Sequence, residues 1–170
     1  MIAVVDDRRL ALAATARGFD FDRIFRDEAG GVYRTLYAFT GGRSHIAEEA
    51  TAEAFARAIA HAATIRDPLP WIYRTAFRVA AVELKRESRR DAVFEGGEEP
   101  MPDGIADLVR ALRQLSPNQR AALVLRYEAD LPVDEVARRM GTAAPTVRVH
   151  IHRGRKRLRD LLGAEEVEDR

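Results

Sequence analysis

Residues 131–162, LPVDEVARRMGTAAPTVRVHIHRGRKRLRDLL, carry the most informative pattern in this chain. The first half of this stretch carries apolar or small residues at steps i, i+3, i+4 and i+7, which is the spacing of one face of a helix. These residues are Val133, Val136, Ala137 and Met140. Gly141 follows directly, and a tight turn between two helices needs a residue that adopts positive φ at this point. Ala137 is small, as a close crossing of two helices requires.

A second apolar stripe begins six residues after Gly141 and indicates a second helix. It consists of Val147, Ile151, Gly154, Leu158, Leu161 and Leu162. A helix-turn-helix typically has a small residue, then a glycine four positions later, then an aliphatic residue six positions after the glycine. Ala137, Gly141 and Val147 have this spacing. At 100° per residue, the face opposite the stripe presents a mainly basic set of side chains. This set is Val149, His152, Arg153 and Lys156, with Arg148 on one flank.

An outward basic face on the second helix favours DNA reading in the major groove, because arginine can donate two parallel hydrogen bonds to O6 and N7 of guanine. Arg157 and Arg159 lie further along the helix, and we expect them to hold phosphates. The alternative is an ordinary helical hairpin with a solvated basic face. His150 and His152 do not indicate a metal site, because residues two apart on a helix do not share a face and no third ligand is near.

Helical periodicity continues upstream, so the sequence predicts an all-α protein. We expect helices near residues 22–40, 47–62, 71–90, 105–115 and 117–128. The helix at 22–40 has its apolar face at Phe25, Ala29, Val32, Leu36 and Phe39. Ser116 followed by Pro117 is a helix start with an N-cap. In RDPLP (66–70), two prolines predict a break before the helix at 71–90.

Charge divides the 170-residue chain into blocks, although its formal net charge is only +1. Two blocks are basic, residues 66–90 and 105–163, and concentrated positive charge favours binding to a polyanion. Between them, residues 91–104 are acidic and rich in glycine and proline, which predicts a flexible linker. We therefore expect an N-terminal extension (1–20), a helical domain (21–90), the linker, a helix-turn-helix domain (105–163) and an acidic tail (164–170).

Several classes of protein are disfavoured by what the sequence does not contain. There is no cysteine, which excludes disulfides, thiolate zinc sites and cysteine nucleophiles. We see no serine–histidine–aspartate constellation, metal cluster or glycine-rich phosphate loop, so we expect neither an enzyme nor a cofactor. No apolar run approaches the roughly 18 residues of a membrane span, and we expect a cytoplasmic protein without membrane insertion.

The stretch NQRAALVLRYEADLPVDEVARRMGTAAPTVRVHIHRGRKRLRDLL (118–162) resembles the C-terminal promoter-binding domain of extracytoplasmic-function (ECF) sigma factors. The N-terminal half matches independently. HIAEEATAEAFARAI (45–59) resembles the core-binding helix of that family, and LPWIYRTAFRVAAVELKRESRR (69–90) resembles its helix with an aromatic start and a basic end. The matches occur in the order of the family and cover residues 21–162. Where the family usually has a serine N-cap before the recognition helix, this sequence has Ala143.

The resemblance implies partners and site residues. The implied partners are core RNA polymerase and promoter DNA. The polymerase contacts would be made by the largest-subunit clamp helices and by the flap. An anti-sigma factor is a further implied partner. The implied polymerase-binding residues are Glu48, Glu49, Glu53, Phe55 and Arg57. For the −10 region they are Arg66, Trp71, Tyr73, Arg74, Arg78, Lys85, Arg86, Arg89 and Arg90. For the −35 element they are Arg148, Val149, His152, Arg153 and Lys156.

Two questions stay open at this point. A helix-turn-helix regulator with an N-terminal helical sensor or dimerisation domain is an alternative to a sigma factor, and it would bind palindromic DNA without polymerase. The sequence also does not decide whether the two halves pack against each other when the chain is free.

Overall fold

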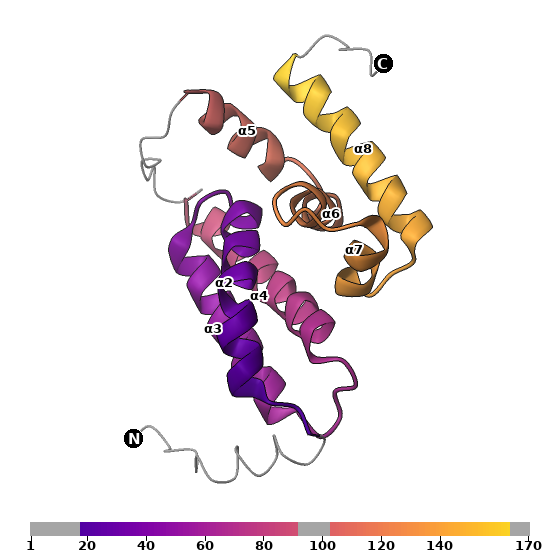
Figure 1. Ribbon diagram of the computed structural model, residues 1–170. Coiled ribbons are helices and arrows are strands. Elements are labelled where there is room, and N and C mark those ends of the chain that lie inside the picture. Colours follow the sequence, from indigo (N-terminus) through magenta and orange to yellow (C-terminus); the bar gives the residue numbers. More distant parts are fainter. Residues whose placement is uncertain (1–17, 92–102, 164–170) are drawn as a thin grey trace.

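The computed structural model describes residues 18–91 and 103–163, in which all regular structure is helical (Figure 1). The predicted all-α class is therefore confirmed. The helices are α2 (Phe21–Thr40), α3 (Ser44–Ala60), α4 (Pro68–Asp91), α5 (Asp103–Arg113), α6 (Pro117–Tyr127), α7 (Val133–Met140) and α8 (Ala144–Leu162). The predicted extension and acidic tail, and the linker at residues 92–102, lie outside the described residues. The helix α5 begins at Asp103, inside the range expected to be linker.

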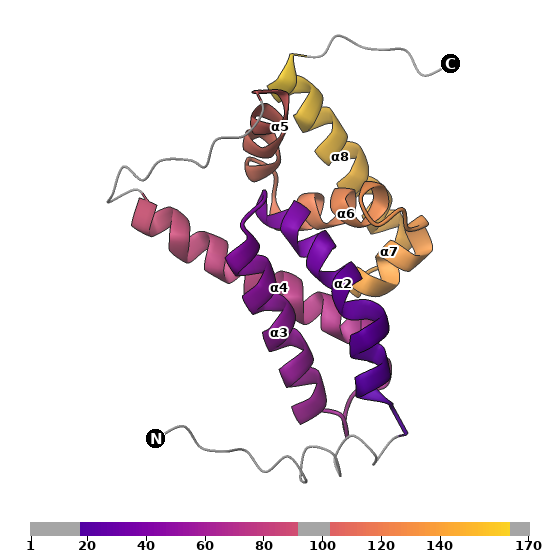
Figure 2. The ribbon, with the colours of Figure 1, turned by 60° about the vertical axis from the view of Figure 1, so that its left-hand side comes forward.

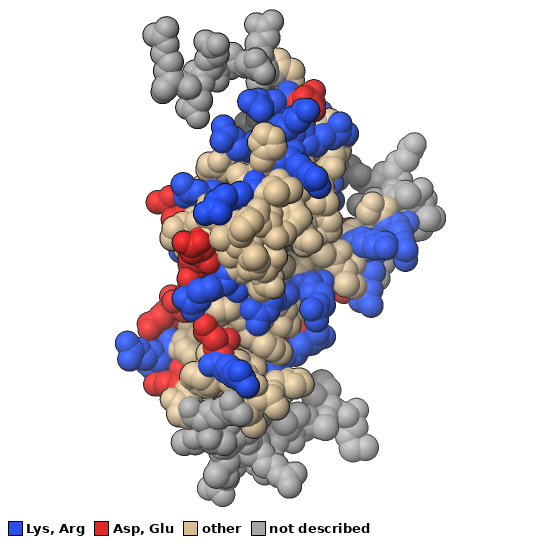
Figure 3. All heavy atoms as spheres, turned by 90° about the vertical axis from the view of Figure 1, so that its right-hand side faces the viewer, with Lys and Arg blue, Asp and Glu red and all other residues tan. Residues whose placement is uncertain are grey.

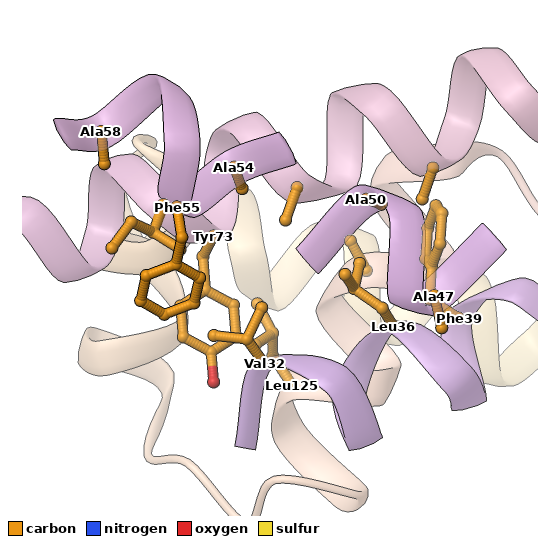
Figure 4. Close-up of a cluster of buried hydrophobic side chains, with 14 of the residues drawn as sticks. Val32, Leu36, Phe39, Ala47, Ala50, Ala54, Phe55, Ala58, Tyr73 and Leu125 are labelled. Carbon is orange, nitrogen blue, oxygen red and sulfur yellow. The ribbon is translucent and has the colours of Figure 1, made fainter. Parts of the chain in front are cut away.

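The helices α2, α3 and α4 pack side by side as the N-terminal half (Figures 1 and 2). The helix α3 turns small side chains toward its neighbours, and these are completely buried; they are Ala47, Ala50, Ala54 and Ala58. Because alanine adds so little bulk, the backbone of α3 can lie close to α2 and α4. Larger side chains of α2, Leu36 and Phe39, fill the space between the helices (Figure 4). Phe25 is the exception in the predicted apolar face, being half exposed and edge-on to Phe55.

The start of α4 corrects the expected break at the two prolines. The helix begins at Pro68, so Pro68 and Pro70 lie inside its first turn. Proline is tolerated there because the N–H groups of a first turn have no intrahelical acceptor, and the fixed φ of proline suits a helix. The prolines therefore start α4 rather than precede it.

The C-terminal half is arranged around α6, which lies between α8 and the N-terminal half (Figures 1 and 2). The predicted N-cap is confirmed: Oγ of Ser116 accepts from the N–H of Gln119, and Oε1 of Gln119 accepts from the N–H of Ser116, both at 3.3 Å. Residues Arg120–Leu125 of α6 are all buried. Two leucines expected on apolar stripes are instead largely exposed, Leu108 of α5 and Leu162 at the end of α8.

The two halves pack against each other, which answers the question that the sequence left open. One cluster of buried side chains runs from the N-terminal helices into α6, α7 and α8, and it includes Leu125, Val136 and Val147, all fully buried. Figure 4 draws Leu125 of α6 beside Val32 of α2. The contacts between the halves join α2 to α6 and α4 to α7. The position of the helix-turn-helix is thus set by the N-terminal domain.

Candidate nucleic-acid interface

The helix-turn-helix forms as predicted. Its first helix, α7, ends at Met140, and Gly141 follows with φ 67°, the left-handed conformation that glycine adopts most readily. The turn is closed by the N–H of Thr142, which donates to the carbonyl of Ala137 at 3.0 Å. Val136 and Val147 are both fully buried between the two helices. The second helix, α8, is therefore held at a fixed angle by local hydrogen bonds and by packing.

The helix α8 lies on α6 through its glycine. A Cβ atom placed at Gly154 would come within 2.8 Å of Cδ1 of Leu123, so no larger residue fits without a shift of Leu123. The opposite face is open. Every side chain predicted to read DNA is exposed there, namely Arg148, Val149, His152, Arg153 and Lys156.

Basic side chains gather in two regions of one face of the molecule (Figure 3). The upper region lies where α8 runs, and Arg155, Arg157 and Arg159 are exposed there in addition to the predicted set. The lower region lies at the level of α4, and a largely uncharged surface separates the two. Such an arrangement suits a long polyanion that contacts both regions.

The basic end of α4 is solvent-exposed, as predicted. Lys85, Arg86 and Arg89 are exposed, and Arg86 pairs with Glu83 on the same helix at 2.6 Å. Further exposed cations are Arg66 and Arg78, whereas the side chain of Arg90 lies outside the described residues. Trp71 is half-buried, and its ring stacks on His61 with the ring centres 6.0 Å apart.

Two predicted DNA contacts of α4 are not free in this conformation: Tyr73 belongs to the buried core and Arg74 is engaged by α7. The Tyr73 ring is only 2% exposed, and the Arg139 guanidinium lies over it, 4.4 Å from the ring centre. Burial raises the pKa of the Tyr73 hydroxyl, consistent with its separation from water. Arg74 is half-buried, and its Nη1 donates to the carbonyl of Arg138 at 3.4 Å. Sequence periodicity along α4 could not foresee this, because the covering residues come from the other half.

The residues expected to bind polymerase are divided between surface and core. Glu48 and Glu49 are exposed on α3. Glu53 pairs with Arg57 one turn away at 2.7 Å, and both are partly exposed. Phe55 is 3% exposed and packs edge-on against Phe25, so in this conformation its ring belongs to the core and not to an exposed docking surface.

One buried cation, Arg120, lies outside the predicted site residues. Arg120 of α6 is only 8% exposed, and burial lowers its pKa to about 10, with smaller contributions from the positive charges of Arg113 and Arg43. It donates to backbone carbonyls of both halves, those of Phe39, Arg113 and Leu115.

Comparisons with known proteins agree with this geometry. A family model described as "Sigma-70, region 4" matches residues 105–158, the segment from α5 to α8. The "ECF RNA polymerase sigma factor SigE" of Mycolicibacterium smegmatis is 32% identical over 167 residues, covering 87% of this chain and 63% of the relative. The "RNA polymerase sigma-E factor" of Streptomyces antibioticus is 30% identical over 169 residues, covering 98% of this chain and 87% of the relative. The chain belongs to the ECF family of sigma factors.

Two solved structures support the fold of this ECF sigma factor. The sigma factor RpoE of Bartonella quintana, solved in complex with the anti-sigma factor NepR, matches with a TM-score of 0.63 at 19% identity, covering 86% of this chain and 99% of that chain. CnrH, solved in complex with the cytosolic domain of CnrY, matches with a TM-score of 0.64 at 22% identity, covering 94% and 99%. The chain spans less than two thirds of the length of the SigE relative. Within residues 18–91 and 103–163, no helix is both long and apolar enough to cross a bilayer.

Proposed function

We propose that this ECF sigma factor binds core RNA polymerase in the cytoplasm and directs it to promoters by contacting the −35 and −10 elements. It acts by binding and carries out no chemistry of its own. The observation that carries the proposal is the exposed basic face of α8, mounted on a helix-turn-helix whose buried side is fixed by Val147 and Gly154.

For the −35 element, α8 enters the major groove with its exposed face. Arg148 and Arg153 are the candidates for guanine recognition, since a guanidinium matches O6 and N7 of that base. Arg157 and Arg159 hold the phosphate backbone and set the register of the helix on the duplex. Val149, 45% exposed among polar neighbours, offers an apolar contact.

For the −10 region, the exposed cations of α4 hold the DNA backbone. They are Arg78, Lys85, Arg86 and Arg89, together with Arg66 before the helix. Arg90, whose side chain lies outside the described residues, is proposed with them from its place in the sequence. Trp71 offers a partly open aromatic face on which an unpaired base can stack, a contact worth roughly 1–3 kcal/mol. Arg74 joins this surface once α7 no longer engages it, whereas Tyr73 lies in the core of the N-terminal half.

Core polymerase meets the exposed carboxylates of α3. Glu48 and Glu49 point to solvent, and the Glu53–Arg57 pair lies one turn further along the same helix. Their partner is a basic surface of the polymerase clamp. An anti-sigma factor is a further proposed partner, because RpoE of Bartonella quintana was solved in complex with one.

Transcription in vitro tests the proposal. Core polymerase is supplied with or without this protein on a library of promoters, and we expect specific initiation only when the protein is present. The Arg148→Ala/Arg153→Ala double variant should lose initiation at promoters that depend on a −35 element, and Arg23→Ala on the far end of α2 serves as the control. Tight binding of the protein alone to palindromic DNA as a dimer, without stimulation of polymerase, would contradict the proposal and favour a conventional regulator.

A further inference from the structure

A cleft remains where the helices α4, α6 and α7 meet (Figures 1 and 2). Its volume is about 280 Å³, close to the lower end of the range of small-molecule sites, roughly 300–1,000 Å³. Three arginines line it together with aromatic and small apolar side chains, and none of the lining residues that the structure describes is acidic. This mixture of cations and apolar surface suits a small ligand that is both anionic and partly apolar.

The positive charge of the cleft is only partly neutralised. Glu135, which is not a lining residue, pairs with Arg139 at 2.9 Å. Arg74 has a neutral acceptor, since its Nη1 donates to the carbonyl of Arg138 at 3.4 Å. Arg78 is exposed and makes no ion pair or hydrogen bond with any residue that the structure describes. Two guanidinium groups one turn apart on α4 are thus left without a carboxylate, and an anion placed between them would relieve their repulsion.

The donors of the cleft match a phosphate group. A guanidinium has five N–H donors in a plane and can bind two phosphate oxygens in parallel. The bond from Arg74 to the carbonyl of Arg138 uses only one of these donors. Asn118, the second residue of α6, also lines the cleft, so the positive end of the α6 dipole adds to the field of the arginines.

The apolar lining offers a place for a flat ring. Phe77 is half-buried and meets the buried Phe39 edge-on, with the ring centres 5.0 Å apart. The thioether of Met140 is a further lining group, and sulfur packs favourably against aromatic rings. Ala81 and Ala121 are small lining residues, so they leave this space unfilled. An aromatic ring in the cleft would therefore gain both apolar burial and ring contacts.

We propose that the cleft between α4, α6 and α7 is a binding site for a nucleotide, with its phosphate group on Arg74 and Arg78 and its base against Phe77 and Met140. Walls from three helices suit a ligand enclosed on several sides better than an extended strand. Binding of the nucleotide does not depend on the proposed function. Its consequence does, because Arg74 and Arg78 are also proposed contacts of the −10 region, so that a bound nucleotide and promoter DNA compete for them.

Calorimetric titration of the full chain with ADP and with GDP tests the site. We expect the nucleotides to bind at least tenfold more tightly than either inorganic pyrophosphate or adenosine, because each of these keeps only one half of the ligand. Arg78→Gln should lower the affinity for ADP at least fivefold. The matched control is Arg26→Gln, which removes the same charge from an exposed position on α2 outside the lining and should leave the affinity unchanged.

A second pair of variants tests the place of the ring. Ala81→Phe fills the cleft without removing a charge and should abolish ADP binding, whereas Val82→Phe adds the same ring at the next position, which is 45% exposed and not a lining residue. Thermal unfolding checks that both variants remain folded. In the wild-type chain with isotope-labelled methionine methyl groups, the Met140 signal, assigned with Met140→Leu, should shift on addition of ADP.

The contrary results are distinct from a failure of the proposed function. If neither ADP nor GDP binds, or if pyrophosphate binds as tightly as they do, the nucleotide site is wrong. ADP binding that survives both Arg78→Gln and Ala81→Phe lies elsewhere and also overturns the site. A single-stranded DNA oligonucleotide that binds the free chain more tightly than ADP, and loses this affinity with Arg78→Gln, would assign the cleft to DNA instead. All of these measurements use the free chain, so they leave the transcription assay with core polymerase as the separate test of the sigma function.

Discussion

Arg120 of α6 lies over the ring of Phe39 in α2, with its guanidinium 5.2 Å from the ring centre and its Nη1 donating to the Phe39 carbonyl at 3.3 Å. A single side chain thus binds the ring and the backbone of one residue in the other half. The same guanidinium also donates from Nη2 to the carbonyls of Arg113 and Leu115 at the end of α5. Arg120 therefore ties the end of α5 and the end of α2 to α6.

Replacement of Arg120 by methionine should destabilise the chain by about 1–3 kcal/mol. The substitution keeps apolar bulk but leaves the three carbonyls without their donor, and a buried unpaired acceptor costs this much. Chemical denaturation of both proteins measures the difference in the free energy of unfolding. Arg126→Met is the control, because Arg126 is partly exposed and pairs with the fully exposed Asp130, so its loss should cost little.

The difference in unfolding free energy between the wild-type chain and Arg120→Met should also depend on pH. In the folded state the pKa of Arg120 is lowered to about 10, so the unfolded chain binds the proton more tightly. Its contribution to stability should therefore stay constant below about pH 9 and rise with pH only above about pH 10, where the folded state begins to release the proton. A difference in unfolding free energy that changes between about pH 6 and pH 8 would contradict this assignment.

The close approach of α8 to α6 predicts the effect of filling Gly154. Gly154→Val should destabilise the chain by about 1–3 kcal/mol, because the added Cβ alone would meet Leu123 at 2.8 Å in a packed region. Denaturant titration measures this cost. Combining it with Leu123→Ala should recover part of the loss, since the two side chains compete for one space.

The matched control for Gly154 is Gly30→Ala in α2. A Cβ atom at Gly30 meets only the end of the Arg34 side chain, at 3.5 Å. Alanine there should stabilise the helix by roughly 0.5–1 kcal/mol, because glycine is the poorer helix former. Equal effects at the two glycines would mean that α8 does not lie against Leu123.

Local patterns predicted the helix-turn-helix because its determinants are local. The left-handed turn at Gly141, the buried Val136 and Val147 and the outward basic face of α8 all follow from residues within one helix or its neighbour. Contacts between the halves carry no such periodicity. That Arg139 lies over the Tyr73 ring depends on how α7 meets α4 across 65 intervening residues, and nothing in either helix alone specifies it.

The same distinction applies to the two ends of α4. Its exposed basic C-terminal end follows from composition and helical phase. Two prolines in RDPLP predict a break, but both fall in the first turn of α4, where their missing N–H groups cost nothing. The family resemblance implies a polymerase contact at Phe55, whereas its side chain packs in the core.

An N-cap can be added to the recognition helix. Ala143 occupies the N-cap of α8 with extended backbone, φ −86° and ψ 148°, and makes no side-chain cap bond. Ala143→Ser should stabilise the chain by about 0.5–2 kcal/mol, because the new hydroxyl can accept from the N–H of Thr146. The precedent within this chain is Ser116, which caps α6 in the same way ahead of a proline.

Thermal unfolding of the Ala143 variants measures the effect of the cap. The melting temperature should rise for serine, whereas Ala143→Val, which offers no acceptor, should not stabilise the chain. A serine variant with unchanged stability would indicate that the first turn of α8 already has all the partners it needs from solvent.

Val149 should contribute to base preference through an apolar contact. It is 45% exposed at the centre of the reading face, and a valine there can pack on the C5 methyl group of thymine. Val149→Ala should weaken binding to a −35 site by roughly 1 kcal/mol at the one position concerned, through loss of buried methyl groups. Replacing that thymine with uracil should weaken the wild-type holoenzyme and leave the variant unchanged, which separates a methyl contact from a general loss of packing.

Replacing Arg153 and replacing Arg159 by alanine should weaken DNA binding in different ways, although both are exposed arginines of α8. Arg153 is exposed on the face opposite Ile151 and Leu158, which points into the groove, so Arg153→Ala should cost about 1–3 kcal/mol and relax preference at one base pair. Arg159 lies near the helix end, and Arg159→Ala should weaken binding to all sequences alike and lower the salt dependence of binding by about one phosphate contact. Titration of holoenzyme against −35 sequences varied one base at a time, at several salt concentrations, measures both effects. If Arg153→Ala keeps full discrimination at every position, α8 does not read sequence through this face.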